Sequence, residues 1–373
     1  MHQLRALPVP LVDLTLQHDH IAMEMLPALL DVMSGGDFIG GAKVTAFETA
    51  FAAFCARAHC VGVGNGTDAV EFMLRAAGIG GGDEVIVPAN TFVATAAAIV
   101  RAGARPVFVD CDPVHHLIDV DSFEEHLSRR TRAIVAVHLY GQMARMEELK
   151  LIIGDGALLF EDAAQAQGAT RGGSAPGAWG TAAATSFYPG KNLGAYGDGG
   201  AVLTDDEMLA RRIRALRNHG GEEKDDHGIM GWNSRLDTLQ AVVLSAKLRH
   251  LPAWNAQRAS AAAAYRELLS GHDRITLPSV LPGNEHVWHL FVVRVPDRDR
   301  VCAQLRADGI GAGVHYPVPV HLLPSFRSLG YGPGAFPRAE QAASEILSLP
   351  IFPGITAKQI ERVAEALLLA VAK

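Results

Sequence analysis

Lys191 is the residue whose surroundings point most directly to chemistry. It stands between glycines in the run SFYPGKNLGAYGDGG, residues 186–200, directly after an apolar stretch. Most lysines face solvent, but a lysine held in a tight apolar turn is a candidate for a lowered pKa and for Schiff-base formation with a carbonyl compound. The pattern therefore indicates covalent catalysis by a lysine amine.

A carboxylate at a predicted strand end is the second candidate. Asp162 lies in EDAAQ, residues 161–165, directly after the apolar LLF. Open α/β sheets bind their ligands at the carboxyl ends of strands, and a carboxylate buried there requires a cationic or N–H partner. Asp162 is thus a candidate ligand-binding anion, and a helix N-cap is the alternative interpretation.

A glycine-rich turn supplies the third component. The run GVGNGTDA, residues 62–69, joins a strand-like segment to a helical one, and N–H groups at a helix start favour a phosphate. The dinucleotide-binding pattern GxGxxG is incomplete because Thr67 stands at the third glycine position, and no GK[ST] follows. A plain glycine turn is the alternative. Together, the lysine, the anion and the phosphate turn are the parts that pyridoxal phosphate needs.

The elements that must position these residues alternate between strand and helix. Continuous apolar runs predict strands covered on both faces, namely EVIVPA, PVFVD, AIVAVHLY, ALLFED and AATSFY. Helical stretches such as TFVATAAAIVRAG lie between them. This alternation predicts an α/β fold with right-handed crossovers and a mainly parallel sheet.

A smaller α+β domain is predicted after the sheet. Long helical stretches fill residues 205–257, HLFVVRV and GAGVHYPV predict two further strands, and ITAKQIERVAEALLLAVAK predicts a final helix. We place a large domain at 1–250 and a small C-terminal domain at 251–373.

Composition excludes several other classes of protein. A net charge of −7 does not fit a nucleic-acid binder, and no run of ~18 apolar residues predicts a membrane span. The four cysteines form no CxxC pair, so neither a structural metal site nor a disulfide framework is expected. The N-terminus carries no signal peptide pattern. We expect a cytoplasmic protein without metal, nucleic acid or membrane partners.

Longer motifs carry a resemblance to a known family. The runs are, in order, GNGTDA, PANTFVAT, VDCDP, VHLYGQ, EDAAQA, SFYPGKNLGAYGDGGAV, RNHG, GWNSRLDTLQA and VHYPVPVH. In them the chain resembles the DegT/DnrJ/EryC1/StrS family of sugar aminotransferases, from near residue 35 to the C-terminal helix. The resemblance implies fold type I, the fold of aspartate aminotransferase. It also implies pyridoxal 5'-phosphate as cofactor, pyridoxamine phosphate as intermediate, and a homodimer with shared active sites.

The resemblance assigns cofactor contacts by position. Lys191 would carry the cofactor as a Schiff base, Asp162 would pair with the pyridinium nitrogen, and Gln165 would bind the ring hydroxyl. Phe92 would stack on the ring. The residues implied at the phosphate are Gly66, Thr67, Asp68 and Ser186, with Asn233 from the neighbouring subunit.

The substrate side is implied in the same way. Family members aminate keto sugars linked to nucleoside diphosphates or keto groups on cyclitols. Tyr188, His315 and Tyr316 are candidates for sugar contacts, and Lys224 for the diphosphate. Two carboxylates follow Lys224 directly, where the family often has tyrosine. Carboxylates there disfavour a diphosphate, so they are either solvated or a sign of a different substrate.

The resemblance predicts an amino transfer from L-glutamate to a nucleotide-linked, dTDP-type keto-deoxysugar. The HLYGQ segment favours amination at C3. Amination at C4, a cyclitol ketone of the scyllo-inosose type, and a regulatory protein that binds the cofactor are the alternatives. A histidine in place of Lys191 would indicate a dehydratase, so the lysine favours transamination. His138 and Tyr140, at the end of AIVAVHLY, either line the pocket or pack beside it.

Overall fold

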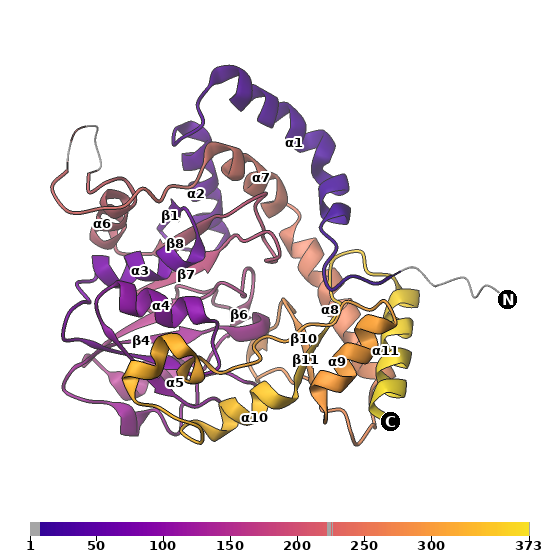
Figure 1. The fold of residues 1–373 in the computed structure, drawn as a ribbon. Helices are drawn as coiled ribbons and strands as arrows, with labels where there is room; N and C mark the ends of the chain where they lie inside the picture. Colours follow the sequence, from indigo (N-terminus) through magenta and orange to yellow (C-terminus); the bar gives the residue numbers. More distant parts are fainter. Residues whose placement is uncertain (1–7, 222–224, 226, 373) are drawn as a thin grey trace.

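The computed structural model describes residues 8–221, 225 and 227–372, and a seven-stranded sheet forms its centre (Figure 1). In spatial order the strands are β1 (His59–Val63), β8 (Gly200–Thr204), β7 (Ala182–Ser186), β5 (Leu158–Asp162), β4 (Thr131–Val137), β2 (Glu84–Pro88) and β3 (Arg105–Val109). β8 is antiparallel to both of its neighbours, and the other adjacent pairs are parallel. The predicted α/β class with a mainly parallel sheet is confirmed.

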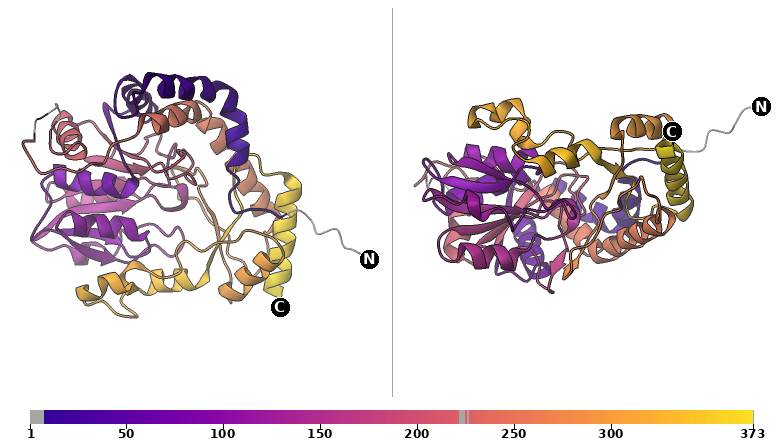
Figure 2. Two further views of the ribbon diagram at one scale, coloured as in Figure 1. Left: turned by 45° about the horizontal axis from the view of Figure 1, so that its top comes forward. Right: turned by 90° about the horizontal axis from the view of Figure 1, so that it is seen from below.

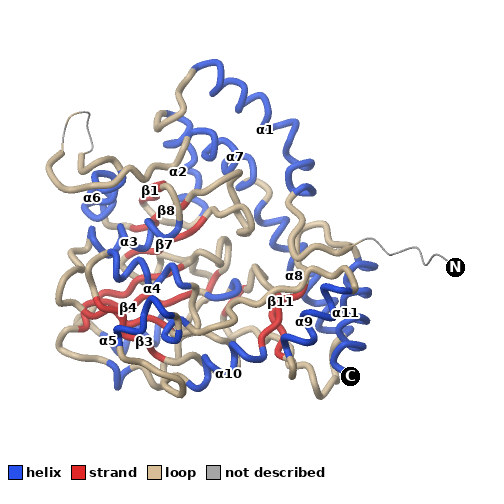
Figure 3. Tube along the Cα trace, viewed as in Figure 1, coloured by secondary structure: helices blue, strands red, loops and turns tan. Residues whose placement is uncertain are grey.

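Helices cover both faces of this sheet, as Figure 3 shows for the red strands between blue helices. One face carries α3 (Gly66–Ala76), α4 (Val93–Arg101) and α6 (Glu207–Arg217); the other carries α2 (Ala42–Phe54), α5 (Met146–Ile153) and α7 (Thr238–Leu248). Each face has its own hydrophobic cluster: Ala133 and Val135 of β4 belong to the cluster under α3, α4 and α6, and Ile134 and Ala136 belong to the cluster under α2, α5 and α7. Burial on both faces explains the continuous apolar runs of the strands.

A third hydrophobic cluster lies beyond the sheet. It packs α8 (Leu251–Leu268), α9 (Arg298–Ala307) and α11 (Ala357–Ala372) against the antiparallel pair β10 (Phe291–Arg294) and β11 (Ile346–Leu349). Val9, from the N-terminal segment, belongs to this cluster and pairs with Ile310. The remaining elements are α1 (Thr15–Gly35), which packs on α7, α10 (Pro337–Glu345), the short strands β6 (Thr170–Arg171) and β9 (Asn284–Glu285), and 3₁₀ turns at Glu124–His126, Leu139–Gly141, Val320–Leu322 and Pro324–Leu329.

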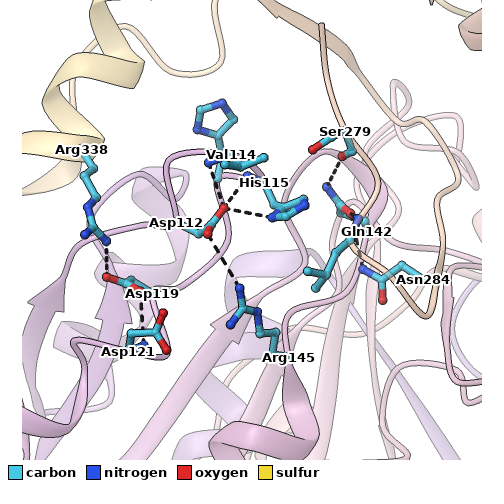
Figure 4. A network of polar contacts seen from close by, with 12 residues as sticks. Asp112, Val114, His115, Asp119, Asp121, Gln142, Arg145, Ser279, Asn284 and Arg338 are labelled. Atoms are coloured by element: carbon cyan, nitrogen blue, oxygen red, sulfur yellow. Dashed lines mark hydrogen bonds and ion pairs between the residues drawn. The ribbon is translucent and has the colours of Figure 1, made fainter. Parts of the chain in front are cut away.

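A clamp of carboxylates ties the C-terminal part of the chain back to the large sheet. The Asp110 carboxylate accepts the N–H groups of Arg338 (2.9 Å) and Ala339 (2.8 Å), so it caps the start of α10. The Arg338 guanidinium also pairs with Asp119 (Figure 4). Both views in Figure 2 show α10 alongside the sheet. Residues beyond 250 pack on the clusters of both sheet faces as well as in the third cluster, and the predicted boundary at residue 250 stays a prediction.

The strand predicted at GAGVHYPV, residues 311–318, is wrong. Only Gly313 in this run exchanges backbone hydrogen bonds with β11, at Ser348. Two residues later, the Tyr140 hydroxyl donates to the carbonyl of His315 (2.6 Å), and the His315 imidazole bonds to the Ser348 hydroxyl (2.8 Å). Side-chain hydrogen bonds therefore hold this segment in place, whereas a strand would be held by backbone hydrogen bonds. It runs along a cavity wall instead.

No helix in the described part of the chain is long and apolar enough to span a bilayer. The cytoplasmic location stays a prediction.

Candidate active site

A cavity of about 520 Å³ lies at the carboxyl ends of the parallel strands. It brings together most of the predicted site residues. They are Gly66, Thr67, Phe92, Asp162, Gln165, Ser186, Tyr188, Lys191, His315 and Tyr316. The strands end at one edge because they run parallel, so residues far apart in sequence converge there. No cluster of three or more His, Cys, Asp or Glu side chains placed to hold a metal occurs among the described residues.

Lys191 lies on the cavity wall within a tight turn. Its N–H donates to the carbonyl of Tyr188 (2.8 Å), and Ala195 N–H donates to the carbonyl of Phe187 (2.8 Å). Burial lowers the pKa of Lys191 to about 8, although the nearby Asp162 carboxylate acts to raise it. The amine is therefore far more often deprotonated near neutral pH than that of a surface lysine, which is the state a nucleophile needs.

Asp162 is held in place by two hydrogen bonds. Its Oδ2 accepts from the Thr95 hydroxyl (2.7 Å), and its Oδ1 accepts from the N–H of Ala164 (3.1 Å). Thr95 in turn bonds to the Thr91 hydroxyl (2.8 Å). Thr95 did not figure in the sequence prediction; it lies in the first turn of α4, and Thr91 lies just before that helix begins. An anion fixed in this way can face the protonated nitrogen of a ring.

The start of α3 forms a cradle for an anion. The first N–H groups of a helix have no partner within the helix, and they attract phosphate. A Cβ atom on Gly66 would lie 2.6 Å from the Ser186 Cβ, and one on Gly200 would lie 2.5 Å from the Asn65 carbonyl oxygen. Glycine is required at both positions because β7, β8 and the helix start approach so closely. The cradle therefore fits a phosphate group.

Asp68 and Asn233, predicted at the phosphate, are not among the lining residues. The Asp68 carboxylate accepts from the Ser234 hydroxyl (2.7 Å) and from Arg101 (2.9 Å), and its N–H donates to Asn65 (2.9 Å). The Asn233 side chain accepts from Arg235 (2.8 Å). Their predicted roles stay predictions. Lys224 lies outside the described residues.

Aromatic side chains and an amide close the middle of the cavity. Phe92 is 48% exposed, and its ring centroid lies 5.0 Å from that of Tyr316. Gln165 donates from Nε2 to the Tyr316 hydroxyl (3.1 Å), and its Oε1 accepts the N–H of Tyr140 (2.6 Å). A planar ring can therefore lie against Phe92 with an amide at its edge.

The sequence left open whether His138 and Tyr140, after β4, line the cavity or pack beside it, and the two residues differ. His138 is fully buried, bonds to the Glu161 carboxylate (2.8 Å), and is not a lining residue. Tyr140 lies next to the cavity, where its backbone and hydroxyl bond to Gln165 and His315. His138 thus packs, whereas Tyr140 supports the wall.

Three lining residues had no signal in the sequence. Leu11 and Val12 come from the N-terminal segment, and His289 comes from the segment before β10. None stands in a motif that indicates chemistry, and all three reach the cavity through tertiary packing.

A buried lysine, a fixed carboxylate and a helix start around one cavity are the binding parts of a pyridoxal phosphate enzyme, so the fold and the site define that class. The chain belongs to the DegT/DnrJ/EryC1/StrS aminotransferase family, whose sequence pattern matches residues 19–368. The predicted family and the predicted enzyme class, an aminotransferase, are confirmed.

Two relatives with assigned names are similar over nearly the whole chain. A pleiotropic regulatory protein of Geobacillus stearothermophilus is 47% identical, over 96% of this chain and 98% of that protein. A dTDP-3-amino-3,4,6-trideoxy-alpha-D-glucose transaminase of Streptomyces venezuelae is 45% identical, over 96% and 95%.

Solved structures agree with the fold. The crystal structure of S. venezuelae DesV in complex with a ketimine intermediate has a TM-score of 0.96 at 44% identity, covering 99% of this chain and 100% of that one. NtdA from Bacillus subtilis, with the cofactor PMP bound, has a TM-score of 0.90 at 31% identity, covering 100% and 87%. The predicted cofactor is thus of the kind that a solved relative holds.

Proposed function

We propose that the protein uses pyridoxal 5'-phosphate to move an amino group from L-glutamate to C3 of a keto-deoxysugar linked to a nucleoside diphosphate, of the dTDP type. The observation that carries this proposal is Lys191, with its lowered pKa, in the same cavity as the fixed carboxylate of Asp162. The S. venezuelae relative, named as a transaminase of a dTDP-3-amino sugar, supports C3 and dTDP.

Each part of the cavity has a role in this reaction. Pyridoxal phosphate supplies an electron sink for the carbon that loses its proton. The Asp162 carboxylate holds the ring nitrogen in its protonated form, and the start of α3 with Ser186 binds the phosphate. Phe92 orients the ring, and Gln165 binds at its edge. These residues would place the reacting carbon within reach of Lys191.

Lys191 performs the proton transfers in this proposal. Its amine would accept a proton from the donor's Cα and deliver it to the carbonyl-derived carbon of the cofactor, and the same amine would reverse these transfers for the sugar. A pKa of about 8 suits both directions, because efficient proton transfer requires a pKa near the working pH.

Three side chains are proposed to contact the sugar. Tyr188 is 60% exposed, so its hydroxyl is available to a ligand. Burial lowers the pKa of His315 to about 4, so this imidazole is neutral when it meets the sugar. The Tyr316 hydroxyl accepts from Gln165 and keeps its own proton to donate.

A homodimer with shared active sites forms part of the proposal. Large apolar side chains of α1 and the loop after it are exposed: Met23, Leu30, Met33, Phe38 and Ile39. Several large apolar side chains left exposed along one segment are a feature of protein–protein interfaces. We propose that a second copy covers it and that Asn233 reaches the partner's phosphate.

The test is a two-stage spectroscopic assay. The purified protein with pyridoxal phosphate should show visible absorbance that L-glutamate bleaches. Nucleotide-linked 3-keto sugars, nucleotide-linked 4-keto sugars and cyclitol ketones should then be added one at a time, to find which of them restores the visible absorbance. Return with a dTDP-3-keto sugar supports the proposal, and return only with a 4-keto sugar or a cyclitol ketone moves the substrate to that class. A protein that takes up no pyridoxal phosphate would contradict the proposal as a whole.

A further inference from the structure

Ser348 is a fully buried residue on β11 that contacts the cavity wall through His315. Its Oγ lies 2.8 Å from Nδ1 of the His315 imidazole. Its backbone N–H and carbonyl both bond to Gly313, which fixes the place of its hydroxyl. Neither the sequence motifs nor the reaction proposed above uses Ser348. Any effect of this hydroxyl on a ligand must therefore pass through the imidazole that it touches.

The Ser348 hydroxyl determines which nitrogen of His315 carries the proton. Among the described residues, this hydroxyl has no hydrogen-bond partner other than Nδ1. If Nδ1 carried the proton and donated it, the hydroxyl would keep its own proton without an acceptor, and a buried donor without an acceptor is costly. Ser348 therefore donates to Nδ1. Burial and the positive charge of Lys191 lower the pKa of His315 to about 4, so the imidazole is neutral and its proton is on Nε2.

The Nε2 nitrogen of His315 opens onto the cavity. His315 is one of the lining residues. Within the described part of the chain, Nε2 has no hydrogen-bond partner, and it is not one of the fully buried polar atoms that lack a partner. A ligand in the cavity can therefore reach the Nε2–H group.

A second residue holds the backbone of His315. The Tyr140 hydroxyl donates to the His315 carbonyl (2.6 Å), and the Tyr140 N–H donates to Oε1 of Gln165 (2.6 Å). Tyr140 follows β4 of the large sheet, whereas Ser348 lies on β11 of the smaller one. One part of the molecule thus holds the carbonyl of His315 and another holds its ring. The direction of the Nε2–H group is set before a substrate enters.

We propose that Ser348 is a positioning residue for substrate recognition: by donating to Nδ1, it makes His315 present an Nε2–H donor to an acceptor oxygen of the keto sugar. With the proton on Nδ1, the imidazole would present a lone pair to the cavity, and a lone pair repels a carbonyl oxygen. This inference rests on the proposed function, in which His315 contacts the sugar.

The experiment measures the two half-reactions of the holoenzyme separately, in single turnovers with L-glutamate and with a dTDP-linked 3-keto sugar. Ser348→Ala removes the donor to Nδ1. His315→Gln places an amide N–H near the position of Nε2, whereas His315→Asn places one near the position of Nδ1. Ser279→Ala is the matched control, because its hydroxyl is also buried and does not line the cavity. Melting temperature and visible absorbance establish that each variant folds and binds the cofactor.

Ser348→Ala should lower the rate constant per sugar concentration about 3- to 10-fold, which is the effect of losing one hydrogen bond. The glutamate half-reaction should stay near that of wild type, and Ser279→Ala should match wild type in both. His315→Gln should retain more of the sugar half-reaction than His315→Asn. Equal losses in these two variants would overturn the inference, as would a Ser348→Ala loss that is the same in both half-reactions.

A double variant tests whether Ser348 acts through His315. In a protein that already carries His315→Gln, adding Ser348→Ala should cost little more, because residues that act through one contact are not additive. A full additional loss would show that Ser348 acts in another way, and the inference would be wrong.

The position of the proton can also be measured without any reaction. NMR spectra of protein labelled at its histidine nitrogens distinguish a protonated ring nitrogen from an unprotonated one. The signals that disappear in His315→Gln belong to His315. Wild type should carry the proton on Nε2, and a proton on Nδ1 would overturn the inference. If no keto sugar restores the visible absorbance, the proposed function is wrong, and the NMR signals of His315 still decide the role of Ser348.

Discussion

Lys191 and Lys247 have the same pKa shift and opposite surroundings. Burial lowers the pKa of both Lys191 and Lys247 to about 8. Lys191 lies on the wall of the cavity. Lys247 is only 2% exposed, on α7 beneath the active-site loop, and does not line the cavity. A lowered pKa by itself therefore does not identify a reactive lysine; access to a ligand does.

The amine of Lys247 has two partners in the loop that follows Lys191. It donates to the Gly194 carbonyl (2.7 Å) and lies 4.6 Å from the ring centroid of Tyr196. Two turns earlier on α7, the Gln240 side chain accepts the N–H of Tyr196 (2.8 Å). Lys247 thus supports, from the interior, the loop whose other end carries Lys191.

The largest expected effect comes from removing the reactive amine. Lys191→Ala should lower transamination by about 10⁴-fold or more, because this residue supplies both the covalent link and the proton transfers. The visible absorbance of the cofactor adduct should disappear, while the melting temperature stays near that of wild type. Retained adduct absorbance would assign the link to another lysine, and Lys247 would be the first to examine by mass spectrometry after borohydride reduction.

Asp162→Asn should have the next largest effect, about 10²- to 10³-fold on kcat, since a neutral amide no longer holds the ring nitrogen protonated. The Asp162 carboxylate also raises the pKa of Lys191. Its removal should therefore lower the lysine pKa in the cofactor-free protein, as measured by the pH dependence of adduct formation. A pKa that rises instead would contradict the assigned geometry.

Replacing Lys191 and replacing Lys247 should change the free energy of unfolding in different ways. The pKa of Lys191 falls from 10.5 to about 8 on folding, so the unfolded chain binds an extra proton between these values and stability rises with pH across that window. The free-energy cost of holding a protonated Lys191 in the folded protein is fully present below pH 8, and cofactor-free Lys191→Met lacks this cost. The variant should be more stable than wild type near neutral pH by about 3 kcal/mol.

The advantage of Lys191→Met should vanish above the unfolded-state pKa. Lys247→Met should gain nothing near neutral pH, because it leaves the Gly194 carbonyl without its donor. Chemical unfolding at several pH values measures both differences. If the free energy of unfolding depended on pH in the same way in both variants, the proposed difference between the two lysines would be wrong.

The smallest effect is expected for Lys247 in catalysis. Lys247→Met should lower kcat about 3- to 10-fold by loosening the loop, and Lys247→Arg, which keeps a donor and a cation, should recover part of it. Arg249→Met, an exposed cation nearby, is the control. A kcat loss in Lys247→Met as large as that of Lys191→Ala would show that the interior lysine does more than support the loop.

The sheet and the family could be predicted from the sequence, and so could the placement of Lys191, Asp162 and Gly66 around one cavity. Lys191, Asp162 and Gly66 stand in local patterns whose physical requirements are local: a tight turn, a buried strand end, a helix start. Thr95, Lys247 and His289 stand in ordinary helix or strand patterns. Their contacts depend on residues far away in the sequence, so no sequence pattern indicated them. The strand predicted at residues 311–318 was wrong for the same reason.

Tertiary structure alone decided that segments hundreds of residues apart share one wall. Leu11, His289 and His315 meet Lys191 because parallel strands end at one edge and the C-terminal segment packs back across them. A sequence pattern records the backbone's local preference. The hydrogen bonds that join Asn192 to His289, Val287 and Asn255 depend on three chain segments packed together, and no one of these segments encodes them alone.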